Sequence, residues 1–153
     1  MGVNEALARE VLETVPMVMR TIRTQVRSQR KSDLSVPQFR TLGFLNRNPG
    51  STLSDVAEHV GLTLPAMSRL VDGLVSRDLM TRNISVDDRR RVELTLTKSG
   101  TAILEEARRM AQTKLAEILE PLTAEEGAAV MAAMRHLRVA FGQPAQAPTS
   151  PGR

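Results

Sequence analysis

The strongest constraint on the fold is a pattern between Thr52 and Met80, in which two amphipathic stretches are joined by a glycine. Two helices that cross at a fixed angle need a small residue at the crossing point and a residue free to turn between them. Ala57 and Gly61 supply these two features. The apolar residues that would lock the angle follow at helical spacing: Val56, Val60, Leu62, Met67 and Leu70. The sequence therefore predicts a helix-turn-helix over residues 52–80.

The flanking sequence predicts further helices and one β-hairpin. Apolar residues recur with a helical period over residues 1–30 and 97–121, and Ser35, Thr52 and Thr123 each begin a capping-box sequence. Alternating residues over 80–84 and 92–96 predict the two strands of a hairpin. Pro16 is expected to kink the first helix or to divide it into two, because proline removes a backbone donor and clashes with the preceding turn. The expected fold class is mainly α with a small β-hairpin, a winged helix-turn-helix with helices on both sides.

Composition narrows the classes of function. The 153 residues carry a net charge of +4, which weakly favours a polyanionic partner. The absence of cysteine excludes disulfides, thiolate metal sites and cysteine redox chemistry. Aromatic residues are scarce, so base-stacking surfaces are disfavoured, and duplex DNA is favoured over single strands or RNA loops. The N-terminal stretch has acidic residues and no continuous apolar run, so we expect no signal peptide, no membrane span and a soluble, cytoplasmic protein.

One side of the second helix of the motif is expected to face outward. It carries Thr63, Pro65, Ala66, Ser68, Arg69 and Asp72. Small residues near the start of the helix would let it enter the major groove of DNA. Arg69 is the predicted base reader, because a guanidinium can donate two hydrogen bonds to guanine; the alternative is a solvated surface arginine. Ser68, Thr63 and Ser54 are candidates for phosphate contacts, with local helix capping as the alternative for Thr63 and Ser54.

The tip of the expected hairpin is strongly charged. It contains Asp87, Asp88, Arg89, Arg90 and Arg91. The three arginines are predicted to contact DNA, since arginine is attracted into a narrow minor groove by its negative potential. An aspartate would repel phosphate there unless it paired with an arginine, so Asp88 is interpreted as orienting the guanidinium of Arg90. A solvated charged loop is the alternative interpretation of the whole cluster.

The run from Thr52 to Gly100, with its Asp-Arg-Arg wing and its LTLTKSG segment, resembles the winged helix-turn-helix of the MarR family. The resemblance extends over residues 4–141. It implies a homodimer joined through an N-terminal helix in residues 1–34 and C-terminal helices in residues 98–141. The DNA-binding region would then occupy residues 35–97, and residues 142–153, rich in proline, alanine and glutamine, are expected to be a disordered tail.

The resemblance also assigns roles by position. Arg69 resembles the base-contacting arginine of the family's recognition helix, Arg90 its minor-groove arginine, and Asp88 the aspartate that orients it. The groove-facing positions correspond to Pro65, Ala66 and Ser68. Family members commonly repress transcription and are released by small, often aromatic or phenolic, ligands. The resemblance therefore implies a sequence-specific regulator that binds an inverted-repeat operator as a dimer, with a small-molecule effector.

Other functions find less support in the sequence. It holds no nucleophile beside a placed histidine and no phosphate-binding glycine loop, so we expect no enzyme, no catalytic residue and no cofactor. His59 and His136 are interpreted as surface or helix-packing residues rather than metal ligands. A winged-helix module used for protein association is the alternative to a DNA reader. A basic stripe has no settled role, with phosphate contact, effector contact and a solvated face all open; it comprises Arg20, Arg23, Arg27, Arg30 and Lys31.

Overall fold

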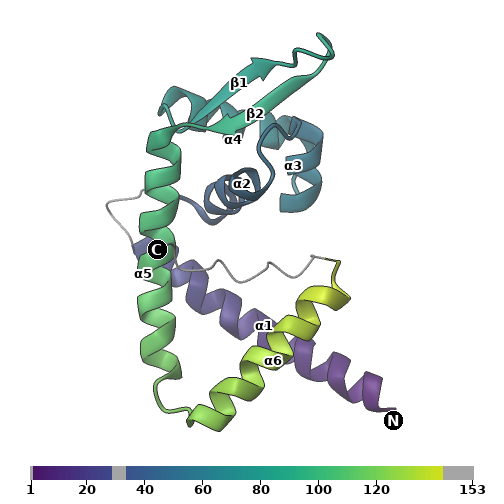
Figure 1. The fold of residues 1–153 in the computed structure, drawn as a ribbon, viewed down its shortest axis with the longest axis vertical. Helices are drawn as coiled ribbons and strands as arrows, with labels where there is room; N and C mark the ends of the chain where they lie inside the picture. Colours follow the sequence, from purple (N-terminus) through teal and green to yellow (C-terminus); the bar gives the residue numbers. More distant parts are fainter. Residues whose placement is uncertain (1, 29–33, 143–153) are drawn as a thin grey trace, which may run out of the picture. The chain divides into compact units, whose positions relative to one another are not determined.

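The structure, a computed structural model, describes residues 2–28 and 34–142. The elements along the chain are α1 (Val3–Ser28), α2 (Val36–Arg47), α3 (Leu53–Val60), α4 (Leu64–Ser76), β1 (Met80–Ile84), β2 (Val92–Leu96), α5 (Lys98–Leu119) and α6 (Ala124–Ala140). Figure 1 shows this order of helices with the single hairpin between α4 and α5. The expected fold class, mainly α with a small β-hairpin, is confirmed.

The chain divides into two compact units, residues 1–114 and residues 115–153. The first unit contains α1 to α4, the hairpin and most of α5. The second contains the end of α5 and the helix α6, which begins at the expected capping box. There the backbone N–H of Thr123 donates to the carboxylate of Glu126 (2.8 Å), and the backbone N–H of Glu126 donates to the hydroxyl of Thr123 (3.2 Å).

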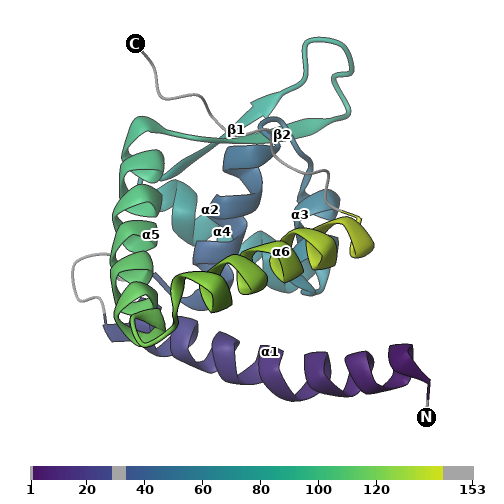
Figure 2. The ribbon, with the colours of Figure 1, turned by 60° about the horizontal axis from the view of Figure 1, so that its bottom comes forward.

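An apolar core holds the helices α2 to α4, the hairpin and the first half of α5 together. Its buried side chains come from the segment before α2, from α2, α3, α4, the hairpin and the first half of α5. They are Leu34, Leu42, Leu45, Val56, Ala57, Val60, Met67, Val71, Leu74, Leu79, Met80, Leu94, Leu104 and Ala107. In both Figure 1 and Figure 2, α2 lies between α5 and α3, so it forms the centre of this arrangement.

Capping residues fix where α2 and α3 begin. The backbone N–H of Ser35 donates to the side-chain oxygen of Gln38 (2.9 Å), and the N–H of Gln38 donates back to the Ser35 hydroxyl (3.2 Å). Thr52 and Asp55 form the same reciprocal pair at the start of α3 (2.9 and 3.3 Å). Each pair satisfies two backbone donors that the first turn of a helix leaves without a partner. The sequence prediction of both helix starts is confirmed.

The two strands pair in antiparallel register from Met80 opposite Leu96 to Ile84 opposite Val92. An isolated bridge between Ser51 and Leu94 joins β2 to the segment before α3. The N–H of Leu94 donates to the carbonyl of Ser51 (2.9 Å), and Leu94 itself is buried in the core. The wing is therefore tied by backbone hydrogen bonds to the helix-turn-helix.

Helix α1 runs through Pro16 without interruption, so the alternative in which proline divides it into two helices is wrong. Proline deprives the carbonyl of Leu12 of its helical donor. Both residues are exposed in the single chain, so water can hydrogen-bond that carbonyl. Of the expected disordered tail, all but Gly142 lies outside the described residues, as do Arg30 and Lys31 of the basic stripe.

Candidate DNA interface

The helix-turn-helix has the geometry that the sequence predicts. Gly61 ends α3 in the left-handed conformation (φ 78°), a region that favours glycine. The N–H groups of Gly61 and Leu62 both donate to the carbonyl of Ala57 (2.9 and 3.0 Å). Ala57 is buried, as expected for a residue at a helix crossing, and Met67 from α4 is fully buried. The short turn between α3 and α4 is therefore fixed by backbone hydrogen bonds and by the core.

A contact from α2 reinforces the end of α3. Arg40 reaches across so that Nη1 donates to the carbonyl of Val60 (3.2 Å) and Nη2 donates to the carbonyl of His59 (3.1 Å). These carbonyls belong to the last turn of α3, where acceptors lack helical partners and where a positive charge is favourable. Sequence reasoning missed this role, because the arginine and its acceptors are about twenty residues apart and no local pattern links them.

His59 packs against α2. Its imidazole stacks on the ring of Phe44 with centroids 4.5 Å apart, which confirms its interpretation as a helix-packing residue. Partial burial lowers the pKa of His59, and the positive charges of Arg40 and Arg47 lower it further. The folded protein therefore favours the neutral imidazole.

This shift predicts a pH dependence of stability. The unfolded chain protonates His59 near its ordinary pKa of about 6.5, whereas the folded protein does so only at lower pH. The contribution to the free energy of unfolding is therefore complete above about pH 6.5 and is lost as the pH falls through the folded-state pKa. Urea denaturation between about pH 5 and pH 7 should show this decline. His59→Phe, which keeps a ring opposite Phe44, should flatten it.

A matched control for this measurement lies on α6. His136 is exposed there, so His136→Gln should leave the decline in place. An equal flattening by both substitutions, or an unchanged profile for His59→Phe, would contradict the assignment to His59.

The outward side of α4 carries the predicted contact residues. Thr63, Pro65 and Arg69 are exposed, Ala66 and Ser68 are half-buried, and the opposite side of the helix faces the core. Among the described residues, no hydrogen bond or ion pair occupies the guanidinium of Arg69, so its donors are available to a ligand. After the exposed Leu64, which begins α4, the outward side chains of Pro65, Ala66 and Ser68 are cyclic or small. Arg69 is the first long polar side chain of the helix.

The two hydroxyl candidates differ in their surroundings. The hydroxyl of Thr63 accepts a hydrogen bond from the N–H of Ala66 (3.4 Å). Thr63 therefore caps α4, which was the alternative to a phosphate contact. Ser54 does not cap α3, because Thr52 occupies that position. Ser54 is exposed in the first turn of α3, and its hydroxyl has no partner among the described residues. The capping alternative is therefore confirmed for Thr63 and wrong for Ser54.

An ion pair links α4 to the wing. The Asp72 carboxylate on α4 lies 2.5 Å from Nη2 of Arg82 on β1, and both side chains are partly exposed. Exposed ion pairs contribute little to stability, about 0 to 1 kcal/mol. This one joins α4 to the strand that leads into the wing, so it restricts their relative orientation. The helical pattern predicted only that Asp72 faces outward, and it did not predict the pairing with Arg82.

Asp88 shapes the tip of the wing through the backbone. Its carboxylate accepts the backbone N–H of Arg90 (2.9 Å), and its carbonyl accepts the N–H of Arg91 (2.9 Å). The hydroxyl of the buried Ser85 accepts the N–H of Asp88 (3.4 Å), and the N–H of Ser85 donates to the carbonyl of Arg91 (2.8 Å). Among the described residues, no ion pair joins the Asp88 carboxylate to the guanidinium of Arg90, so the expected pairing is not formed. Asp88 instead fixes the turn that carries the arginine.

The three wing arginines are all exposed, but Arg91 has a distinct environment. Hydrogen bonds with the backbone and side chain of Thr52 lower the pKa of Asp55, and the positive charge of Arg91 lowers it further. Arg91 therefore lies near the first turn of α3, at the base of the wing. Arg89 and Arg90 occupy the tip.

Three further features concern metal ligands, membrane-spanning helices and the basic stripe of α1. Residues 2–28 and 34–142 contain no group of three or more histidine, aspartate or glutamate side chains arranged to hold a metal ion. The helices within these ranges are too short or too polar to cross a membrane. In the basic stripe of α1, Arg20 and Arg23 are exposed, whereas the side chain of Arg27 lies outside the described part.

Comparison with known proteins decides the family. A family model described as "MarR family" matches residues 32–91. The HTH-type transcriptional repressor Rv2887 of Mycobacterium tuberculosis is 30% identical over 93 residues, which cover 61% of this chain and 67% of that protein. The chain belongs to the MarR family. Another relative in sequence, the HTH-type transcriptional regulator YfiV of Bacillus subtilis, is 35% identical over 100 residues, 65% of this chain and 62% of YfiV.

Solved structures support the same fold for this MarR-family chain. Rv1404 from Mycobacterium tuberculosis superposes with a TM-score of 0.80 at 24% identity, covering 96% of this chain and 99% of that one. A mutant of MarR from E. coli, complexed with operator DNA, superposes with a TM-score of 0.63 at 24% identity, covering 86% and 93%. At this level of identity the superpositions show the winged-helix fold alone. The aligned curated relatives extend beyond the match, which spans about two thirds of their length.

Proposed function

We propose that this MarR-family chain is a cytoplasmic, sequence-specific regulator of transcription that binds double-stranded DNA as a homodimer. The observation that carries the proposal is the exposed side of α4, where Arg69 has free donors, on the same lobe as a wing with three exposed arginines. A helix in the major groove and an arginine-bearing wing beside it can contact base edges and phosphates together. The curated relatives are named as transcriptional regulators, which supports the same role.

The proposal of a dimer is supported by apolar side chains that are exposed in the single chain. On α1 they include Val3, Leu7, Leu12 and Val15, and on α6 they include Val130, Met131, Met134 and Val139. No residue of α6 is buried. A contiguous apolar helix face exposed to water is unfavourable and typical of an interface. We therefore assign residues 1–34 and 98–141 to dimerisation and residues 35–97 to DNA binding.

Repression and release by a ligand complete the proposed function. Rv2887 is named a repressor, which supports a negative effect on transcription. The small-molecule effector follows from the family resemblance. Screening aromatic acids for release of bound duplex would identify it.

Selection from a random duplex library tests the function. We expect enrichment of one sequence, an inverted repeat with half-sites about 10 base pairs apart, because a symmetric dimer places two recognition helices one helical turn apart. Enrichment of a single unrepeated half-site would contradict the dimeric mode. Absence of any enrichment would contradict sequence-specific reading and favour a winged helix used for protein association.

Arg90→Ala should weaken binding to all duplexes to a similar degree. An arginine that contacts phosphate or the minor groove contributes mainly through charge, so its loss should reduce the slope of log affinity against log salt by about 1. Titration by fluorescence anisotropy over a salt series measures this slope. Arg109→Ala, which removes the same charge from α5, should leave the slope unchanged. A change of base preference in Arg90→Ala would contradict its assignment as a non-specific contact.

A further inference from the structure

Two guanidinium groups converge on a bare stretch of α2. A methyl group placed on Gly43 would lie 3.6 Å from Nη2 of Arg108 and 3.9 Å from Nη1 of Arg47. Gly43 is buried, and Arg108 comes from α5, whereas Arg47 lies one turn further along α2. The missing side chain at Gly43 therefore leaves room for both guanidinium groups to approach the same point.

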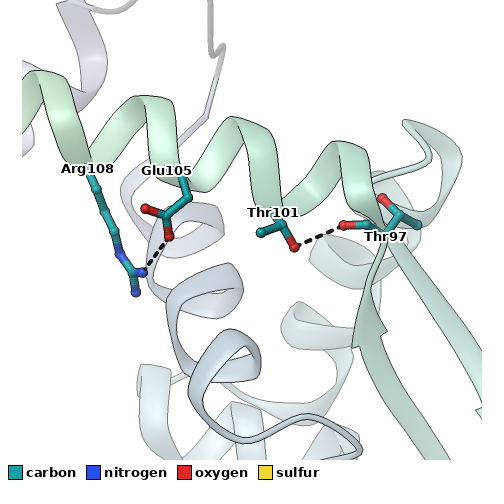
Figure 3. Close-up of polar contacts among 4 residues, drawn as sticks. All are labelled: Thr97, Thr101, Glu105 and Arg108. Carbon is teal, nitrogen blue, oxygen red and sulfur yellow. Dashed lines mark hydrogen bonds and ion pairs between the residues drawn. The ribbon is translucent and has the colours of Figure 1, made fainter. Parts of the chain in front are cut away.

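The two arginines are not neutralised equally. Nη1 of Arg108 lies 3.1 Å from the Glu105 carboxylate, an ion pair that Figure 3 shows on one side of α5. Nη2 of Arg108 is the nitrogen that lies near Gly43. Arg47 has no carboxylate partner within residues 2–28 and 34–142. Of the two guanidinium groups, therefore, only that of Arg108 has a carboxylate partner among the described residues.

The proximity has an electrostatic cost. Partial burial lowers the pKa of Arg47, and the like charge of Arg108 lowers it further. Arginine nonetheless remains protonated at neutral pH, so the repulsion persists in the folded protein. An anion between the two groups would remove it.

We propose that Arg47 and Arg108, which approach each other over Gly43, form a binding site for a small oxyanion, a carboxylate or phosphate group that bridges the two guanidiniums. Planar guanidinium groups recognise such oxyanions through paired hydrogen bonds. The Arg108 side chain is 31% exposed, so an anion can reach it from solvent. The site uses none of the side chains predicted to contact DNA, and it does not depend on the proposed function.

Calorimetric titration of the full chain without DNA tests this site. The probes are inorganic phosphate and benzoate, each compared with chloride at constant ionic strength, and the tighter of the two identifies the kind of oxyanion. Arg47→Gln and Arg108→Gln should each lower the affinity roughly tenfold or more, because each removes a charge-assisted contact. Glu105→Gln should raise the affinity, since it removes the carboxylate that competes for Arg108.

A control variant and several contrary outcomes make this test of the anion site specific. Arg109→Gln removes the neighbouring arginine, which pairs with Glu106, and should leave anion binding unchanged. The gain expected for Glu105→Gln separates a binding role from a structural one, because a damaged fold cannot bind more tightly. The proposal is overturned if neither probe binds saturably. It is also overturned if Arg109→Gln lowers the affinity for the anion as much as Arg47→Gln does. A third contrary result would be that Arg47→Gln weakens binding to duplex DNA and leaves the affinity for both anions unchanged.

Discussion

Gly100→Ala is expected to lower the free energy of unfolding by about 2 to 3 kcal/mol, the upper part of the range for overpacked sites. A Cβ on Gly100 would lie 2.0 Å from the carbonyl oxygen of Leu79, a backbone atom that no side-chain rotation can move away. Two hydrogen bonds hold that junction together. The N–H of Thr97 donates to the carbonyl of Leu79 (3.2 Å), and the Thr97 hydroxyl donates to the carbonyl of Asp78 (2.6 Å).

The sign of this effect distinguishes packing from helix propensity. An alanine in a helix is ordinarily more stable than a glycine by about 1 kcal/mol. Gly73→Ala on α4 provides the matched control, because nothing lies within 4 Å of its Cβ position, and it should leave stability unchanged or raise it. Urea denaturation at one protein concentration measures both variants. Equal stabilities for the two variants would contradict the close approach of α5 to Leu79.

Arg69→Ala is expected to remove about 1 to 3 kcal/mol of discrimination between the selected site and its single-base variants, roughly 5- to 150-fold. The reason is that its guanidinium is exposed on α4 and has no partner among the described residues, so its donors can pair with a guanine edge. The measurement is the affinity for a panel of duplexes that differ at one base pair.

A second arginine, the residue that caps the C-terminal end of α4, controls for charge. Arg77→Ala, at the C-terminal end of α4, should change the affinity for every duplex in the panel by a similar factor and leave the base preference intact. If Arg69→Ala also shifted all duplexes equally, Arg69 would be a phosphate contact rather than the base reader.

Local sequence rules predicted most of the helix and strand boundaries. The capping boxes at Ser35, Thr52 and Thr123 and the turn at Gly61 depend on residues within four positions of one another, so their geometry can be read from spacing. The alternation over 92–96 likewise indicated a strand because neighbouring residues face opposite sides of a sheet.

Contacts between distant segments could not be predicted in this way. Arg40 holds the end of α3 from another helix, and Arg82 pairs with Asp72 across the junction of α4 and β1. The need for glycine at Gly100 arises only where α5 approaches Leu79. Asp88 was predicted to orient the guanidinium of Arg90, but its carboxylate accepts the backbone N–H of Arg90 instead. In each case the residue is visible in the sequence, but its contact partner is determined by the tertiary structure.

The central claim, sequence-specific reading of duplex DNA, is tested most directly by a competition measurement. The affinity for the selected inverted repeat is compared with that for a scrambled duplex of equal length and composition, at about 50 mM and 200 mM salt. We expect the selected site to bind at least about 10³-fold more tightly than the scrambled duplex, with both affinities falling as salt rises. Equal affinities for the two duplexes at both salt concentrations would contradict the account.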